Sequence, residues 1–346
     1  MGTFPLLVLS CHYSYSFSHP GMVCLCGRSM HNKLQLLLNH SLTLSYENWL
    51  RFPVTDLYAE ISIYPTFRSM RNSLLKPAAE PALCLLRSRF AGYLEDVTLS
   101  ESEEDLANFL TSEGALLRPT QELVYRMVSP LLDGYIRTSI LPSKFSRTPS
   151  IAPPFNNNTR SLNVLETLKE SLKYFDKDNI RLAAFRSYKV SPVKVGGASH
   201  THVPRESVYD NELMGILSNW LQGNYGWSVT GQWHLRNPSE KHKFSDIVLK
   251  KDQTIVLELL ATGNRAFIRS HIDKTPEYMS LLSADEAWVV HFTCQDNFCP
   301  SWQSDTDDVN VVHFSHDLNF TRVLMNARFK DEAGIVKEIK DELVAI

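Results

Sequence analysis

The spacing of apolar positions divides the chain into regions of different predicted structure. Residues 1–75 show no sustained period and have no predicted fold. From residue 76 the apolar positions recur at the spacing of helices, and Pro130 is expected to kink or split one of them. A stretch rich in Pro, Ser and Asn at residues 142–161 is typical of a linker. The pattern therefore predicts a mainly α-helical domain over residues 76–195.

The pattern changes after residue 204, where short apolar runs alternate with amphipathic stretches. The runs that predict strands are YGWSVTGQWHL, FSDIVL, TIVLELLA, AWVVHF and VNVVHF. The segment NRAFIRSHIDK predicts a helix, Thr275-Pro276 predicts the start of another, and FTRVLMNARF predicts a third. This order indicates a compact α/β domain over residues 204–328. Residues 329–346 are charged and amphipathic, and they are predicted to form a C-terminal helix.

Composition and charge narrow the classes of function. The 346 residues are 43% hydrophobic and 21% charged, which is ordinary for a globular protein. The net charge of −3 is unevenly spread, because residues 201–346 carry 14 Lys and Arg against 21 Asp and Glu. We therefore do not expect a protein that binds nucleic acid through general positive charge. Contact with phosphate groups would require a local patch, and the basic residues next to one predicted hairpin are Lys241, His242, Lys243, Lys250 and Lys251.

The sequence also bears on the cellular compartment. Six cysteines in a chain of this length do not make a disulfide scaffold, so an intracellular protein with reduced thiols is expected. No apolar run approaches the roughly 18 residues that a membrane helix needs. The N-terminal stretch has no positive region of the kind that opens a secretory signal peptide.

Two acidic residues stand in otherwise apolar strands, Asp246 in FSDIVL and Glu258 in TIVLELLA. If the polar turn KKDQ has its centre at Asp252, residues whose numbers sum to 504 are cross-strand partners, and Asp246 lies opposite Glu258 on one face. Like charges directly opposite each other destabilise a sheet. Two carboxylates in an apolar frame are favourable when they share a cation, and oxygen ligands suit Mg²⁺ or Mn²⁺. We therefore expect a metal site at Asp246 and Glu258.

A third acid is expected at this site on helical geometry. In the helix that begins near Ser207, Glu212 is four residues from both Val208 and Ile216, so it falls within the apolar face. The alternative is a Glu at the edge of that face, paired with a nearby Lys or Arg.

A helix with an acid, a strand with Asp and a strand with Glu resemble the core of the PD-(D/E)XK, or restriction-endonuclease-like, nucleases. More specifically, FSDIVLKKDQTIVLELLATG, SADEAWVVHFTC and VNVVHFSHD resemble the C-terminal domain of Crinkler-type effector proteins. Upstream strings such as HVPRESVYDNELMGILSNWL extend the resemblance over roughly residues 94–328. It implies a restriction-endonuclease-like mixed sheet flanked by helices, preceded by the mainly helical domain.

The sequence departs from this family at two residues of the motif, of which Ser245 in place of a proline is the milder change. The resemblance implies a lysine two residues after the second acid, on the same face of the strand, but this position is Leu260. The predicted helix that follows carries Arg265, Arg269 and Lys274, any of which would supply a positive charge to the acids if its face is turned to them. Lys274 is the preferred substitute, because an ammonium group matches the missing lysine better than a guanidinium group does.

A different site is suggested by the two VVHF phrases. If the two strands are parallel neighbours, His291 and His313 lie close together, and Cys294, Cys299 and His316 add further zinc ligands. The alternative is that these histidines form hydrogen bonds at the strand ends.

The expected function is that of a metal-dependent nuclease-like protein that hydrolyses phosphodiester bonds in DNA or RNA. Its catalytic residues would be Asp246, Glu258, Glu212 and Lys274, and its cofactor Mg²⁺ or Mn²⁺. The alternative is a catalytically inactive nuclease-like fold that acts as an effector or interaction module. A protein partner would bind through residues 94–190. The expected location is intracellular, including the nucleus, with secretion as an effector as an alternative.

Overall fold

The computed structural model describes residues 54–346 apart from positions 120, 146, 159, 188 and 301 and residues 236–242 and 303–308. The chain divides into two compact units, Met1–Lys144 and Phe145–Ile346. Most of the segment expected to be irregular, residues 1–53, lies outside the described residues, but residues 54–75 are largely helical and not irregular. No helix among the described residues is long and apolar enough to cross a membrane.

The first unit is mainly helical, as the sequence predicts, and also contains a small antiparallel sheet of strand order β1-β3-β2. Pro130 does not kink a helix but starts one, at a position where its missing N–H has no partner to lose, and the Ser129 side chain caps that helix. The α-helices are α4 (Val54–Ile63), α5 (Pro65–Leu74), α6 (Glu80–Leu85), α7 (Glu104–Ser112), α8 (Pro130–Tyr135) and α9 (Leu141–Lys144), and the strands are β1 (Val97–Thr98), β2 (Leu116–Leu117) and β3 (Val124–Met127). Shorter 3₁₀ or π-helical turns cover Pro77–Ala79, Leu86–Phe90, Glu101–Glu103 and Ile136–Ile140.

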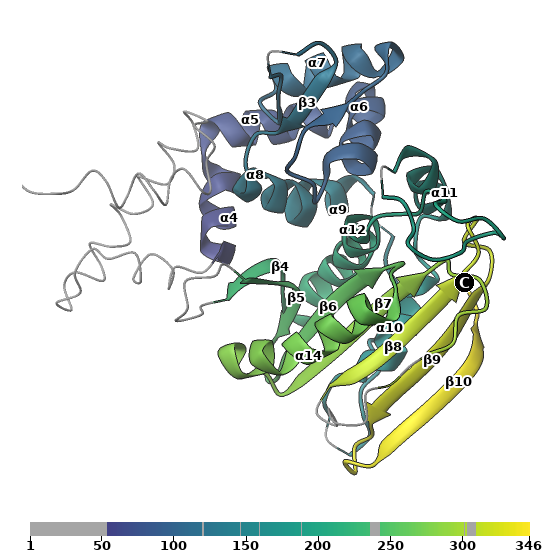
Figure 1. Ribbon diagram of the computed structural model, residues 1–346. Coiled ribbons are helices and arrows are strands. Elements are labelled where there is room, and N and C mark those ends of the chain that lie inside the picture. The colour runs from purple at the N-terminus through teal and green to yellow at the C-terminus, as the bar shows by residue number, and fades with distance from the viewer. Residues whose placement is uncertain are drawn as a thin grey trace, which may run out of the picture. The chain divides into compact units, whose positions relative to one another are not determined.

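The second unit is an α/β structure around a seven-stranded mixed sheet of order β10-β9-β8-β7-β6-β5-β4 (Figure 1). The central strands β6, β7 and β8 are parallel, and all other neighbours are antiparallel. The strands are β4 (Ser228–Leu235), β5 (Lys243–Lys250), β6 (Thr254–Ala261), β7 (Glu286–Thr293), β8 (Asn310–His316), β9 (Val323–Lys330) and β10 (Val336–Val344). The expected α/β class is therefore confirmed.

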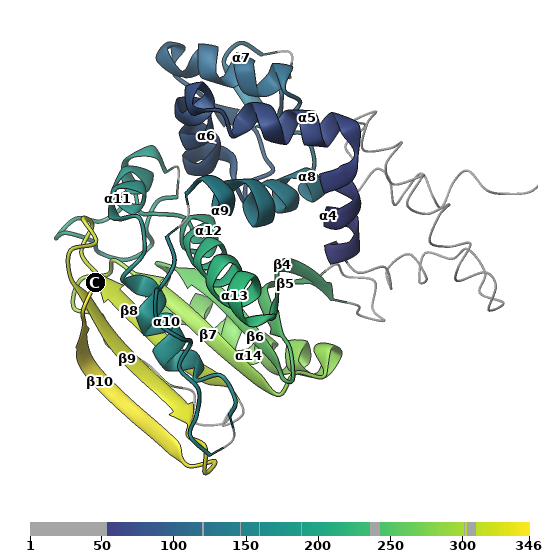
Figure 2. The same ribbon diagram turned by 180° about the vertical axis from the view of Figure 1, so that it is seen from behind.

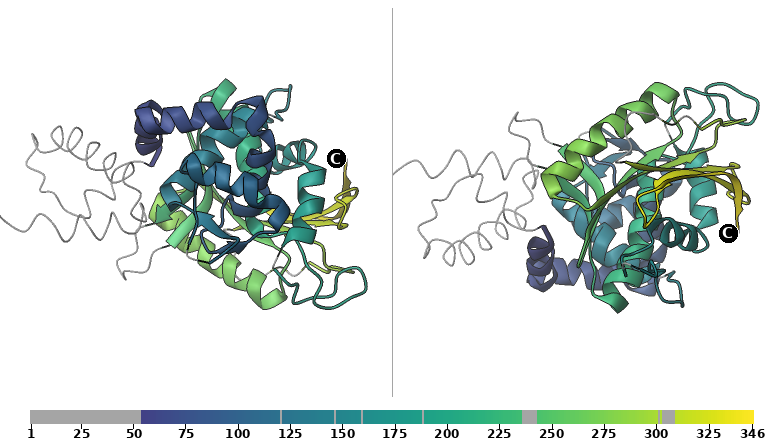
Figure 3. Two further views of the ribbon diagram at one scale, coloured as in Figure 1. Left: turned by 90° about the horizontal axis from the view of Figure 1, so that it is seen from above. Right: turned by 90° about the horizontal axis from the view of Figure 1, so that it is seen from below.

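Helices cover both faces of this sheet. The α-helices are α10 (Val164–Leu172), α11 (Lys177–Arg186), α12 (Glu206–Leu217), α13 (Gly223–Tyr225) and α14 (Arg265–Leu282), with a π-helical turn at Ser218–Gln222. Helix α14 lies on one face and α10 and α12 lie on the other (Figures 1 and 2), and the same layers are seen from above and below in Figure 3. The larger apolar core joins α10 and α12 to alternate residues of the strands, including Leu257, Leu259 and Phe292. The intervening residues of β6, such as Val256 and Leu260, face α14.

The division between the units differs from the expected boundary. Residues 145–195 belong to the second unit, whereas the sequence pattern assigned residues 76–195 to the helical domain. The reason is the amphipathic helix α10, whose Leu165 and Leu168 pack into the same core as Leu213 of α12 and Leu257 of β6. The Pro/Ser/Asn-rich stretch thus begins at the division between the units and runs into the second one.

Three helix predictions in the second unit are wrong. FTRVLMNARF and most of the C-terminal residues 329–346 form the hairpin β9–β10 instead of two helices. The turn between them is stabilised by Asp331, whose Oδ1 accepts hydrogen bonds from the amides of Ala333 and Ile335, and by Gly334 at φ 75°. Likewise, no new helix starts at Thr275-Pro276, because α14 continues through Pro276 to Leu282.

Candidate functional site

Strands β5 and β6 separate at the two acids. Their antiparallel pairing runs from Lys250↔Thr254 to Ile247↔Leu257, so partner numbers sum to 504 as the turn at Asp252 predicts. The pairing ends just before Asp246 and Glu258, the next position in that register. Beyond it β5 remains paired with β4. The two carboxylates therefore lie where the strand pairing ends, with Asp246 partly exposed and Glu258 buried.

Asp246 fixes this fork through a hydrogen bond. Its Oδ2 accepts from the backbone amide of Leu259, at 2.7 Å. A charge-assisted bond of this length is among the stronger hydrogen bonds in proteins. This hydrogen bond takes the place of the backbone hydrogen bonds between β5 and β6, which end just before this position. It also holds the Asp246 carboxylate next to the backbone that follows Glu258.

Glu258 is a buried carboxyl group with only one oxygen in a hydrogen bond. Its Oε1 lies 2.9 Å from Nδ1 of His271 on α14, while Oε2 is buried without a hydrogen-bond partner in the described part of the chain. Burial, together with the negative charge of Glu206, raises the pKa of Glu258 to about 8, and the positive charge of Lys274 opposes the shift. Burial and the negative charges of Glu258, Asp246 and Glu277 raise the pKa of Tyr278 to about 12. An ionised Glu258 would therefore need a further positive charge nearby.

Helix α14 brings His271 and Lys274 to the acids. Asn264 caps this helix by accepting a hydrogen bond from the amide of Phe267, which fixes where its first turn begins. The positive charge of Lys274 acts on Glu258 and on His271. Burial, together with Lys274, lowers the pKa of His271, so this imidazole is a neutral partner for Glu258 at neutral pH. The positive charge of Lys274 thus acts on Glu258, while its part in catalysis stays a prediction.

Glu206 and Lys189 act electrostatically on the residues of the site, and the sequence pattern did not indicate either of them. Glu206 is the first residue of α12. Burial raises its pKa, and the positive charges of Lys189 and Lys274 oppose that shift. Lys189 comes from the irregular segment before α12, where its backbone carbonyl accepts a hydrogen bond from the amide of Val203. Burial lowers the pKa of Lys189, and Glu206 counteracts this effect.

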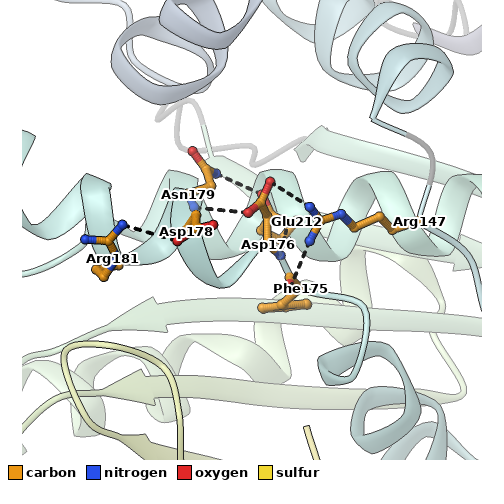
Figure 4. A network of polar contacts seen from close by, with 7 residues as sticks. All are labelled: Arg147, Phe175, Asp176, Asp178, Asn179, Arg181 and Glu212. Carbon is orange, nitrogen blue, oxygen red and sulfur yellow. Dashed lines mark hydrogen bonds and ion pairs between the residues drawn. The ribbon is translucent and has the colours of Figure 1, made fainter.

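Glu212 does not belong to the site, contrary to expectation. Its side chain is buried, as its position on the apolar face predicts, with 4% exposed. However, its Oε2 accepts from the amide of Asp176 and its Oε1 from Nδ2 of Asn179, each at 2.9 Å (Figure 4). Asp176 caps α11 and also pairs with Arg147, at 3.3 Å. The helical spacing correctly places Glu212 toward the protein interior, but its partners are at the N-terminus of α11 and not in the β5–β6 fork.

The two VVHF histidines do meet, because β7 and β8 are parallel neighbours in which His291 pairs with His313. Their Nδ1 atoms are 3.0 Å apart, and both side chains are fully buried. Burial lowers the pKa of His313 to about 3 and that of His291 well below its usual value, so both rings are neutral and one donates its proton to the other. Two of the remaining zinc candidates lie elsewhere: Cys294 contacts His316, which is hydrogen-bonded to Tyr209. These contacts favour the reading in which the histidines form hydrogen bonds.

The residues at the fork are suited to magnesium more than to zinc. Among the described residues no group of three or more His, Cys, Asp or Glu side chains is placed to hold a metal ion. Mg²⁺ does not require such a group, because it usually keeps several waters and binds through one or two carboxylates together with substrate phosphates. Asp246 and Glu258 are residues of the type that this mode of binding uses, and Oε2 of Glu258 has no hydrogen-bond partner among the described residues.

Only part of the expected basic patch can be placed. Lys241 and His242 lie outside the described residues, as does the side chain of Lys243. Lys250 is exposed at the end of β5, and Nζ of Lys251 donates to the carbonyl of Tyr225 at 3.1 Å.

Comparisons of the chain with models of protein families, with curated proteins and with solved structures found no match.

Proposed function

We propose that the chain is a metal-dependent nuclease-like protein that hydrolyses phosphodiester bonds in nucleic acid. The observation that supports this most is the fork of β5 and β6, where Asp246 and the buried Glu258 stand at matched positions of the two strands. A buried Glu with one unpartnered oxygen is costly unless a cation compensates its charge. The mixed sheet with helices on both faces is compatible with a restriction-endonuclease-like fold.

In this proposal Asp246 and Glu258 hold Mg²⁺ or Mn²⁺. The bound ion would lower the pKa of a water molecule and neutralise charge on the scissile phosphate. The residues of the chain position these groups: Leu259 orients Asp246 through its amide, and His271 orients Glu258 through Nδ1. Glu206 takes the supporting role for which Glu212 was expected, because it is the helix acid whose charge reaches Glu258.

Lys274 is proposed to replace the lysine that is missing at position 260. Leu260 is fully buried in the apolar cluster formed with Ile268 and Ile272, so no cation at that position contacts the acids. The exposed ammonium group of Lys274 acts on Glu258 from α14. We propose that it contacts the phosphate or the attacking water. Lys189, on the side of Glu206, adds a second positive charge to the same site.

Residues 94–328 resemble Crinkler-type proteins, and this resemblance supports a proposal about the role of the protein and its place of action. We propose an effector-like protein with an intracellular or nuclear site of action. DNA or RNA is its proposed substrate, and residues 94–190 are a proposed region for a protein partner.

A catalytically silent version of the same fold is the second candidate, and one observation favours it. The strand position expected to carry the catalytic lysine is occupied by a leucine that is fully buried. In that case the fork would be retained as part of the fold, and the protein would act by binding a partner.

The two candidates differ in a cleavage assay with the full chain. Single- and double-stranded DNA and RNA would be incubated with Mg²⁺ or Mn²⁺, with and without EDTA, using the wild type and Asp246→Asn. Asp252→Asn is a matched control, because this exposed residue lies in the turn between the same strands. Metal-dependent cleavage that is lost in Asp246→Asn but kept in Asp252→Asn supports the nuclease. Absence of cleavage of every substrate by a folded wild type supports the silent fold.

A further inference from the structure

A second site is formed by a cavity of about 690 Å³ in the same unit. It lies at the amino ends of β7 and β8, between the start of α10 and the β9–β10 turn. None of the residues of the Asp246–Glu258 site lines it. The volume is within the range of small-molecule binding sites, roughly 300–1,000 Å³.

The main polar group of this cavity is Glu286, the first residue of β7. Its Oε1 accepts two hydrogen bonds, from Nε1 of Trp288 at 2.6 Å and from Nδ2 of Asn310 at 3.1 Å. Asn310 is itself fixed, because its Oδ1 accepts from the amide of Lys330 at 2.9 Å. Within the described residues Oε2 of Glu286 has no hydrogen-bond partner. The carboxyl group is thus held in one orientation, with one oxygen available to a ligand.

The charge of the lining is negative, and one wall is aromatic. Besides Glu286, the acids Asp285, Asp331 and Glu332 line the cavity, against Lys330 as the basic residue. Trp288 and Phe329 also line it, stacked at 5.9 Å between ring centroids with 28° between their planes. Trp288 is only 2% exposed, so the partly exposed Phe329 provides most of the aromatic surface. Carboxylates next to aromatic rings attract cationic groups, through charge-assisted hydrogen bonds and through the negative face of the rings.

We propose that this cavity binds a small organic cation, in which a guanidinium or ammonium group contacts Oε2 of Glu286 and an apolar body lies along the Trp288–Phe329 wall. The inference is independent of the nuclease proposal, because it uses no residue of that site. The hydrogen bonds from Trp288 and Asn310 occupy one oxygen of Glu286. They leave the other for the ligand, in the way that preorganised binding groups are held.

The test is a calorimetric titration of the full chain with two probes of the same shape. Benzylguanidinium carries the positive charge, and benzylurea is its neutral counterpart. We expect saturable binding of benzylguanidinium, and affinity for benzylurea that is about tenfold lower or weaker still, because a hydrogen bond between charged groups is stronger than a neutral one. Equal affinity for both probes, or no saturable binding of benzylguanidinium to the wild type, would overturn the proposal.

A substitution at Glu286 tests whether its carboxyl group causes the preference for benzylguanidinium. Glu286→Gln keeps an acceptor for Trp288 and Asn310 but removes the negative charge. It should therefore lower the affinity for benzylguanidinium by about tenfold and leave the affinity for benzylurea nearly unchanged. Glu338→Gln is the matched control, since Glu338 lies on β10 outside the lining. Circular dichroism would confirm that each variant is folded. If Glu286→Gln does not fold, Glu332→Gln at the exposed rim should weaken benzylguanidinium selectively. An equal loss for both probes would contradict the proposal.

Discussion

Oδ2 of Asp246 accepts a hydrogen bond from the backbone amide of Leu259 at 2.7 Å, and so ties β5 to β6 just where their pairing ends. Asp246 therefore has a structural part as well as its proposed part in metal binding. Asp246→Asn keeps an acceptor, whereas Asp246→Ala leaves the Leu259 amide without one. We expect Asp246→Ala to lower the free energy of unfolding by about 1–2 kcal/mol more than Asp246→Asn does. Urea denaturation measures this difference, and equal stability of the two variants would show that the bond contributes little.

Glu206 and Glu212, both on α12, have different predicted parts. Glu206→Gln should lower the rate of cleavage by about tenfold or more, because it removes a carboxylate from the electrostatic environment of the site. Glu212→Gln should instead lower the free energy of unfolding by about 1–2 kcal/mol, since Glu212 accepts hydrogen bonds from Asp176 and Asn179. Cleavage rates per folded molecule and denaturation curves separate the effects. A loss of cleavage only in the Glu212 variant would restore Glu212 to the site.

The proposed role of Lys274 predicts a change in rate without a change in stability. Its side chain is exposed, so Lys274→Met should alter the free energy of unfolding by no more than about 0.5 kcal/mol. The rate of metal-dependent cleavage should fall by about 10- to 100-fold, because the positive charge near Glu258 is lost. Arg269→Met removes an exposed charge from the same helix and is the control. Similar rates for the two variants would argue against Lys274 as the substitute for the missing lysine.

The buried histidine pair predicts a stability that falls toward acidic pH. In the unfolded chain His291 and His313 take up protons near pH 6.5, but in the folded protein burial lowers the pKa of His313 to about 3 and that of His291 well below 6.5. Between these values the unfolded state binds more protons, so the free energy of unfolding declines as the pH falls from 6.5 toward 3. Each histidine contributes up to about 1.4 kcal/mol per pH unit.

Replacement of both histidines tests this dependence. The double variant His291→Leu/His313→Leu removes the titrating groups and leaves no unpartnered polar atom in their place. Its free energy of unfolding, measured by denaturant titration between pH 4 and 7, should depend less steeply on pH than that of the wild type. An unchanged slope would mean that other groups, such as His316 with its pKa of about 4, determine the acid sensitivity.

The register of β5 and β6 could be predicted from the sequence because its information is local, whereas the end of the pairing before Asp246 and Glu258 was not predicted. A polar turn centred on Asp252 sets the register of β5 and β6, and the period of two then places Asp246 and Glu258 on one face. The partners of Glu212 could not be predicted this way. The period of a helix shows to which side a residue points, but it does not show which element packs against that side. Helix α11 is brought next to Glu212 by the fold of the whole unit. Lys189 comes from an irregular segment, where no period gives a direction.

The C-terminal hairpin shows how one pattern fits two structures. Ile335, Ile339 and Leu343 recur every four residues, a spacing that puts them on one face of a helix. In the structure Ile335 precedes β10, and a bulge between Ile339 and Glu342 leaves Leu343 exposed while Val344 is buried. Alternation in β9, where Val323, Met325 and Ala327 are buried, and the Gly at position 334 were the signals for a hairpin. The charged side chains of β10 suit an edge strand exposed to water.

The most direct test of the central claim is a calorimetric titration of Mn²⁺ into the full chain, for the wild type, Asp246→Asn and the control Asp252→Asn. The titration would be repeated with a short oligonucleotide present, because Mg²⁺ and similar ions use substrate phosphates as ligands. We predict binding to the wild type and to Asp252→Asn, and loss of that binding in Asp246→Asn while the variant remains folded. Equal binding by all three proteins, or no binding to the wild type even with the oligonucleotide, would contradict a metal site at Asp246 and Glu258.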